Sequence, residues 1–170
     1  MKRCGLFPAM LLTVSFVLLP VVLAAEEVAG WSTGHTQKSE MMEVGDVPGH
    51  LMGVSQFHGL SYYTKGPDKG EMINRMGTTI FDVVKGKGIG TGYEVKTFTD
   101  GSTIVLKFSG DQLPIDGGKK TAMEGTWEVA GGTGRYAGAK GSGTYKTVRI
   151  GDFKTGSDTY SDFTGTLTTK

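Results

Sequence analysis

Three histidines, His35, His50 and His58, are the side chains of this sequence best suited to bind a metal ion or to move a proton near neutral pH. Ligands on one strand must lie two residues apart to share a face, whereas these histidines fall on separate predicted elements or at a turn. The spacing therefore disfavours a zinc site, and we predict neither a bound metal nor a cofactor. Hydrogen-bonded or exposed histidines are the alternative interpretation.

His58 is the most interesting of the three because Val54, Leu60 and Tyr62 share its parity along a predicted strand. That parity would place His58 among apolar neighbours in the interior, where it could position or protonate a bound molecule. A histidine that bonds to a carbonyl or faces solvent is the other interpretation.

Aromatic side chains suggest an apolar binding cavity. Trp127 shares its parity with Met123 and Val129, and together with Tyr62 and Tyr93 it could line a cavity for an apolar ligand. Plain core packing would explain the same residues. We predict His58, Tyr62, Tyr93 and Trp127 as the ligand-binding residues and leave any catalytic residue unassigned.

Some charged residues within predicted strands bear on the composition of the interior. Glu124 and Glu128 have the parity opposite to Trp127, so we expect both carboxylates at the surface. Arg75, Asp82 and Glu94 are single charges whose burial would be costly unless they are paired. A polar patch in the cavity, a subunit interface or plain exposure could explain these three.

Glycine-rich segments imitate a nucleotide site without its context. Gly132-Thr133-Gly134 and Gly138 resemble part of a dinucleotide fingerprint, but Gly141 and Gly143 prevent the helix that must follow it. We interpret the segment as a turn in which Gly131, Gly132 and Gly134 adopt positive φ angles and Tyr136 closes one end of the fold. The 18 basic and 17 acidic residues give no reason to expect a nucleic-acid partner.

The elements that position these residues are strands. The 28 glycines leave no room for a long helix, and the runs between them are rich in Thr, Val, Ile, Tyr and Phe. Only Arg135 to Ala139 suggests a helical turn. Eight runs read as strands: His35 to Val44, His50 to Thr64, Met72 to Val84, Ile89 to Phe98, Thr103 to Ser109, Thr121 to Ala130, Ser142 to Ile150 and Ser157 to Thr168.

We therefore predict an all-β fold, a single eight-stranded antiparallel β-barrel over residues 35–170, preceded by an irregular segment over residues 26–34. Closure into a barrel removes the exposed edges of an open sheet. A two-sheet sandwich is the structural alternative.

Residues 1–25 have the pattern of a signal peptide. Lys2 and Arg3 precede an apolar stretch, and cleavage after Ala24 or Ala25 would leave a polar mature start. Pro8 and Pro20 argue against a membrane anchor. We therefore expect an exported protein, periplasmic or secreted, with no membrane association after cleavage. The single cysteine, Cys4, would leave with the signal, which excludes disulfides and a thiol nucleophile.

The segment from Glu124 to Tyr145, EGTWEVAGGTGRYAGAKGSGTY, resembles the GGTG-aromatic-x-G motif of allene oxide cyclase barrels and plant dirigent proteins. The resemblance covers His50 to Thr168 and is greatest to exported bacterial members of this group. It implies a calycin-like eight-stranded barrel with a mostly apolar cavity, often assembled as a trimer. It implies no single activity, and neither the plant cyclase's catalytic glutamate and cysteine nor the dirigent family's polar cavity residues match positions in this sequence.

These observations favour an exported β-barrel protein that binds a small apolar or aromatic molecule in its cavity. One alternative is a cyclase or isomerase in which His58 or a buried carboxylate assists proton transfer. The other is a non-catalytic oligomeric interaction module.

Overall fold

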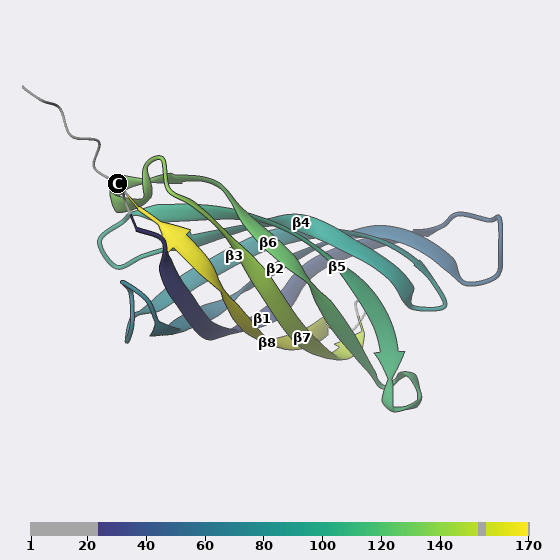
Figure 1. The fold of residues 1–170 in the computed structure, drawn as a ribbon. Coiled ribbons are helices and arrows are strands. Elements are labelled where there is room, and N and C mark those ends of the chain that lie inside the picture. The colour runs from purple at the N-terminus through teal and green to yellow at the C-terminus, as the bar shows by residue number, and fades with distance from the viewer. Residues whose placement is uncertain (1–23, 153–155, 170) are drawn as a thin grey trace, which may run out of the picture.

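The computed structural model describes residues 24–152 and 156–169, and these form one closed barrel of antiparallel strands (Figure 1). Every strand pairs with its neighbour in sequence, and β1 pairs with β8 to close the ring. The predicted fold class is therefore confirmed. The strands are β1 (Glu26–Glu43), β2 (His50–Lys65), β3 (Met72–Val84), β4 (Lys87–Thr97), β5 (Thr103–Ile115), β6 (Lys120–Thr133), β7 (Lys140–Asp152) and β8 (Gly156–Thr168).

The prediction of an irregular segment over residues 26–34 is wrong, because β1 begins at Glu26. This stretch is poor in strand-favouring residues, yet it forms backbone ladders with a strand on each side. Gly30, for example, pairs with Tyr63 of β2 and with Phe163 of β8. Ladder pairing on two edges thus overrides weak local propensity. Residues 1–23 lie outside the described residues, so the signal peptide stays a prediction. No helix in the described part of the chain is long and apolar enough to cross a membrane.

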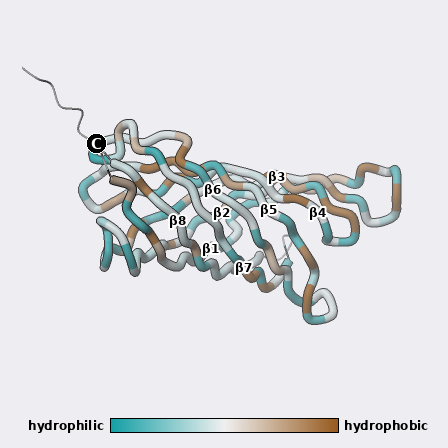
Figure 2. The backbone as a smooth tube through the Cα atoms, in the orientation of Figure 1, coloured by the Kyte–Doolittle hydropathy of each residue, from teal (hydrophilic) through white to brown (hydrophobic). Residues whose placement is uncertain are grey.

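Burial alternates along the strands, with a break in β1 between Thr36 and Lys38, so about every second side chain enters the barrel. On β3 the inward series includes Ile73, Arg75, Gly77, Thr79 and Phe81, while the even-numbered residues face outward. Hydrophobic and hydrophilic stretches accordingly intermix along the strands (Figure 2).

Inward glycines make room for large inward aromatic side chains. A Cβ atom on any of these glycines would lie 2.4–2.8 Å from an aromatic side chain of a nearby strand. The aromatic side chains therefore lie against the bare backbone instead of filling the barrel axis. The pairs are Phe57 with Gly77, Phe81 with Gly53, Phe108 with Gly92, Trp127 with Gly143 and Gly165, Phe163 with Gly30, and Tyr145 with Gly110.

A compact cluster of apolar residues closes the end of the barrel where β1 begins and β8 ends. Tyr136 is 1% exposed and stacks on Phe98 with ring centroids 4.5 Å apart. We call this cluster the end plug. Its members are Val28, Tyr63, Ile73, Phe98, Ile104, Leu106, Trp127, Tyr136, Ala139, Phe163 and Leu167.

The glycine-rich turn supplies the central residue of the end plug. A single 3₁₀ turn, Gly134–Tyr136, stands where the helical turn was predicted, and Tyr136 closes the barrel end as expected. Gly134 has a positive φ of 58°, but the prediction of positive φ at Gly131 and Gly132 is wrong. Gly132 is needed for a different reason, since a Cβ there would lie 2.6 Å from the carbonyl oxygen of Tyr136.

Arg135 fastens this turn to two neighbouring loops. Its guanidinium lies within 3.2 Å of Asp68, 2.7 Å of Glu71 and 3.4 Å of Asp100. It also lies over the Phe98 ring, 4.6 Å from the centroid. One arginine thus ties three loops together over the end plug, which leaves the remaining length of the barrel as the place for a cavity.

Replacing an inward glycine should destabilise the barrel. In Gly77→Ala the new methyl group would lie 2.4 Å from the Phe57 ring and 2.5 Å from the Tyr93 carbonyl oxygen. We expect the free energy of unfolding to fall by about 1–3 kcal/mol, which chemical denaturation would measure.

Gly131→Ala is the matched control, because a Cβ at Gly131 has no neighbouring atom within 4 Å and the residue has no positive φ. We expect its stability to be unchanged or higher by up to about 1 kcal/mol. Equal losses in the two variants would show that steric contact with the ring is not the cause.

Candidate functional site

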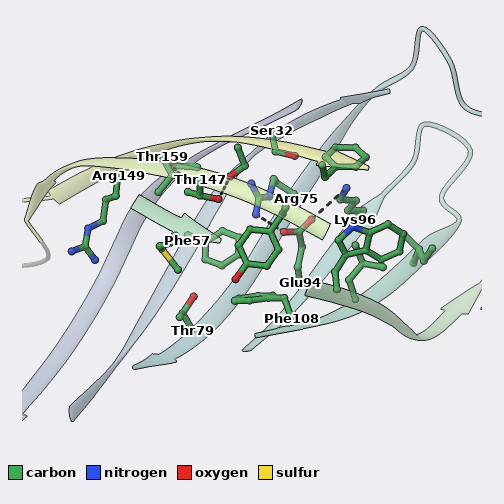
Figure 3. A pocket seen from close by; sticks show the side chains of 18 of the residues that line it. Ser32, Phe57, Arg75, Thr79, Glu94, Lys96, Phe108, Thr147, Arg149 and Thr159 are labelled. Carbon is green, nitrogen blue, oxygen red and sulfur yellow. Dashed lines mark hydrogen bonds and ion pairs between the residues drawn. The ribbon is translucent and has the colours of Figure 1, made fainter. Parts of the chain in front are cut away.

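The barrel encloses a cavity of about 120 Å³ on the inner side of the end plug. It extends from the neighbourhood of Lys96 toward Arg149 near the opposite end, as the two ends of Figure 3 show. Strands β5 and β6 give it an apolar wall. The side chains of this wall are Ile104, Leu106, Phe108, Met123 and Trp127.

The wall formed by β1, β7 and β8 carries hydroxyl groups. Thr147 and Ser161 share a hydrogen bond of 2.7 Å, and the Thr159 hydroxyl donates to the Gly34 carbonyl oxygen at 3.3 Å. Ser32 and Thr36 continue this wall along β1. Ser32 bonds to Ser61 and Thr36 to Ser157, so these hydroxyls are satisfied within the wall. With Arg149 of β7 toward the far end, this wall is polar, and the cavity is amphipathic.

Three charged side chains from β3 and β4 meet at the cavity, and we call them the ion cluster: Arg75, Glu94 and Lys96 (Figure 3). Arg75 and Lys96 are directly paired across the two strands, where like charges alone would repel. Glu94 lies between them. Its Oε2 accepts a hydrogen bond from Arg75, and its Oε1 lies 3.6 Å from Lys96 Nζ.

The ion cluster is almost completely buried, since its side chains are only 10%, 9% and 3% exposed for Arg75, Glu94 and Lys96. Burial by itself raises the pKa of the Glu94 carboxyl, but the charges of Arg75 and Lys96 outweigh burial and hold that pKa below its ordinary value. Burial lowers the pKa of Lys96 to about 8 although Glu94 opposes the shift. With Lys96 protonated at neutral pH, two cations share one carboxylate, and the cluster carries one net positive charge.

Aromatic rings pack against the two cations. Lys96 Nζ lies 3.9 Å from the Phe163 ring centroid and 5.0 Å from that of Tyr63. The Arg75 guanidinium lies 4.8 Å from the Phe57 ring centroid. Such contacts offset part of the cost of removing the cations from water.

Trp127 is the one predicted ligand-binding residue that lines this cavity. It is 7% exposed, and its indole Nε1 donates a hydrogen bond to the Thr164 carbonyl oxygen at 3.2 Å. The prediction that Trp127 faces the interior is confirmed, as is the surface position of Glu124 and Glu128.

The interior placement of His58, Tyr62 and Tyr93 is wrong, because all three lie on the outer face. On β2 the inward residues are the odd-numbered ones, such as Phe57 and Tyr63, so the predicted parity was inverted. His58 is exposed, Tyr93 is 53% exposed, and Tyr62 stacks on Trp31 with ring centroids 5.6 Å apart.

The cause of this error is an outer face that is itself apolar. Val54 and Ile80 pair directly across β2 and β3 and are 37% and 53% exposed. Large exposed apolar patches mark interaction surfaces. The predicted homo-oligomer stays a prediction. Exposed apolar residues of β2, β3 and β4 are Met52, Val54, Leu60, Met72, Met76, Ile80, Val84, Ile89 and Tyr93.

The other two histidines pair with carboxylates. His35 lies 2.8 Å from Asp158, and His50 contacts both Asp46 and Asp82 at 2.6 and 2.8 Å. Hydrogen bonds to Asp82 and Asp46 raise the pKa of His50. Asp82, whose side chain is exposed, lies on the outer face of β3. No group of three His, Cys, Asp or Glu side chains within residues 24–152 and 156–169 is arranged to hold a metal ion.

Sequence reasoning marked two members of the ion cluster and missed the third. Arg75 and Glu94 stand out as single charges in strands, and a polar cavity patch was one of the explanations. Lys96 lies two residues after Glu94 and so shares its face, which is the signal that could have identified it. The hydroxyl wall gives no comparable signal, because serine and threonine are equally common on exposed strand faces.

No protein-family model and no curated protein matches the sequence. Two solved structures of dirigent proteins are similar to the chain. The pterocarpan synthase dirigent protein PsPTS1 has 17% sequence identity and a TM-score of 0.44, with 85% of this chain and 97% of the other covered. The pterocarpan synthase dirigent protein GePTS1 has 15% sequence identity and a TM-score of 0.44, with 94% of this chain and 100% of the other covered. At these values the likeness assigns neither activity nor site residues to this chain.

Removing the shared carboxylate should destabilise the protein strongly. In Glu94→Gln two buried cations face each other without a counterion, and we expect the free energy of unfolding to fall by about 3–5 kcal/mol. In Lys96→Met the neutral pair of Arg75 and Glu94 remains, so we expect stability to be unchanged or higher. Denaturant titration of both variants at pH 7 measures the difference, and a larger loss in Lys96→Met would contradict it.

The stability of the wild type should also depend on pH through Lys96. The folded chain lowers this pKa from 10.5 to about 8, so it binds the proton more weakly than the unfolded chain does. Stability relative to Lys96→Met should therefore rise between about pH 8 and 10.5 and stay constant below pH 8. A difference that falls over this range would show that Lys96 is not desolvated.

Proposed function

We propose that this protein binds a small, largely aromatic molecule inside its barrel. The observation that carries the proposal is the amphipathic cavity, whose apolar wall on β5 and β6 faces a wall of hydroxyl groups. Inward glycines keep the aromatic side chains against the wall, so the axis stays open. A cavity of this composition is the usual form of a small-molecule site.

The size of the cavity supports a ligand with one aromatic ring. Its volume of about 120 Å³ is close to that of an apolar cavity of about 150 Å³ that admits benzene. Phe108 and Trp127 offer ring faces for stacking. The hydroxyl wall offers hydrogen bonds to polar substituents of the ring.

Two ionisable groups of the cavity, Glu94 and Tyr145, are poorly suited to acid-base catalysis at neutral pH. Glu94 is held ionised by two cations, which makes it a weak base. Burial raises the pKa of Tyr145 to about 12, so this phenol keeps its proton at neutral pH. His58, which the cyclase or isomerase alternative invoked, lies on the outer face.

Export is part of the proposal. The charge-then-apolar order of the amino terminus and the small residues Ala24 and Ala25 support an exported, periplasmic or secreted protein. A ligand of this site would then be met outside the cytoplasm.

Filling the cavity should abolish binding. The Thr79 side chain lines the cavity, so the indole of Thr79→Trp would occupy the space of the ligand. Fluorine NMR with a set of fluorinated single-ring aromatic compounds should show line broadening by the wild type and none by this variant.

Thr78→Trp is the matched control, because Thr78 belongs to the same strand and faces outward beside Tyr93. We expect it to broaden the same resonances as the wild type does. Binding that survives in Thr79→Trp and disappears in Thr78→Trp would place the site on the outer face and contradict the proposal.

A further inference from the structure

The geometry points to an anionic ligand: we infer that the molecule bound in the cavity is an aromatic carboxylate whose charged oxygens are held by Lys96 and Arg75. This inference rests on the proposed function and specifies the chemical class of its ligand. It concerns one end of the cavity, where the ion cluster adjoins the end plug.

The charge count of the cavity leaves one positive charge uncompensated. Two cations share the single carboxylate of Glu94. The remaining charged side chain of the described lining, Arg149, is also a cation; it donates to the Thr121 hydroxyl at 2.9 Å and lies in the field of Asp152. An isolated buried charge is costly, and an incoming carboxylate would neutralise it.

Lys96 has hydrogen-bond donors to spare. Its 3.6 Å approach to Glu94 is an ion pair too long for a hydrogen bond, and no other residue of the described chain provides an acceptor. The rings of Phe163 and Tyr63 pack against its Nζ, and neither ring offers a strong acceptor. An ammonium group that is 3% exposed and lines a cavity is therefore placed to donate to a bound oxygen.

Arg75 also has a hydrogen-bond donor without an acceptor. Its Nε is buried and has no hydrogen-bond partner within residues 24–152 and 156–169. A buried donor without an acceptor costs about 1–3 kcal/mol. The other two nitrogens of its guanidinium donate to Glu94 and to the Thr33 carbonyl oxygen, so only Nε is left over. Each of the two neighbouring cations thus keeps a donor without an acceptor, which a bound acidic group could satisfy.

The rest of the cavity suits a ring attached to that carboxylate. Lys96 and Arg75 hold the two oxygens, and the ring then lies in the section lined by Leu106, Phe108 and Trp127. A cationic ligand would add to the positive charge of the cluster, and a neutral apolar ligand would leave Lys96 without an acceptor. The carboxylate is the group that satisfies both the charge and the donors.

The test compares two probes of nearly equal size, 4-fluorobenzoate and 4-fluorobenzamide, by fluorine NMR titration at pH 7. For the wild type we expect the carboxylate to bind at least about tenfold more tightly than the amide. In Lys96→Met we expect the carboxylate affinity to fall by about tenfold and the amide affinity to stay within about twofold. Lys107→Met serves as the control, because Lys107 pairs with Glu128 at the surface and should change neither affinity.

The outcomes separate this inference from the proposed function. Equal affinity for the two probes, with loss of both in Thr79→Trp, would overturn the anionic ligand and keep the aromatic site. Chloride or acetate that binds as tightly as 4-fluorobenzoate would show a simple anion site and overturn the aromatic carboxylate. Failure of both probes to bind would overturn the proposed function together with the inference.

Discussion

The interior of this barrel depends on contacts between aromatic side chains and bare backbone. Phe57, Phe108 and Trp127 each lie against glycine on another strand, where any side chain would collide with the ring. The rings therefore lie close to the barrel wall, and the barrel axis stays open. A barrel of eight strands is otherwise just wide enough to be filled by its own side chains. Glycine therefore has a second use in this chain besides its use in turns: inward glycines let aromatic side chains lie along the wall, which leaves a cavity at the barrel axis.

The ion cluster occurs where this open space meets the end plug, and stability alone does not explain it. Buried ion pairs generally contribute little to folding, and apolar replacements are often neutral or better. This cluster is less balanced in charge than a simple ion pair, because the single carboxylate of Glu94 faces two cations, Arg75 and Lys96. A cluster that costs stability and faces a cavity has the character of a binding site. The aromatic rings beneath the cations make their burial tolerable without cancelling their charge.

The sequence was a good guide to the strands and a poor guide to their faces. Glycines and turn residues mark the strand ends, so all eight strands could be predicted in part. The first part of β1, which lacks strand-favouring residues, and the second part of β5, which continues past the predicted end at Ser109 to Ile115, were missed. The faces could not be derived where both sides of a strand are apolar. On β2, Leu60 and Val54 are as hydrophobic as a core series, yet they point outward. Glu94 and Lys96 share one face of β4, as their spacing indicates, but only the register of β3 against β4 brings Arg75 to them.

Closure of the barrel by its first and last strands has a consequence for how the chain folds. Ala29 of β1 pairs with Thr164 of β8, so the ring cannot be completed before almost the whole chain is available. The hairpins between neighbouring strands can form locally and early, whereas contacts between distant parts of a chain form slowly. The end plug draws Val28 from β1 and Leu167 from β8, so it belongs to this late step. Pairing of β8 with β1 thus completes the hydroxyl wall and the base of the cavity together, and a chain without β8 would lack part of both.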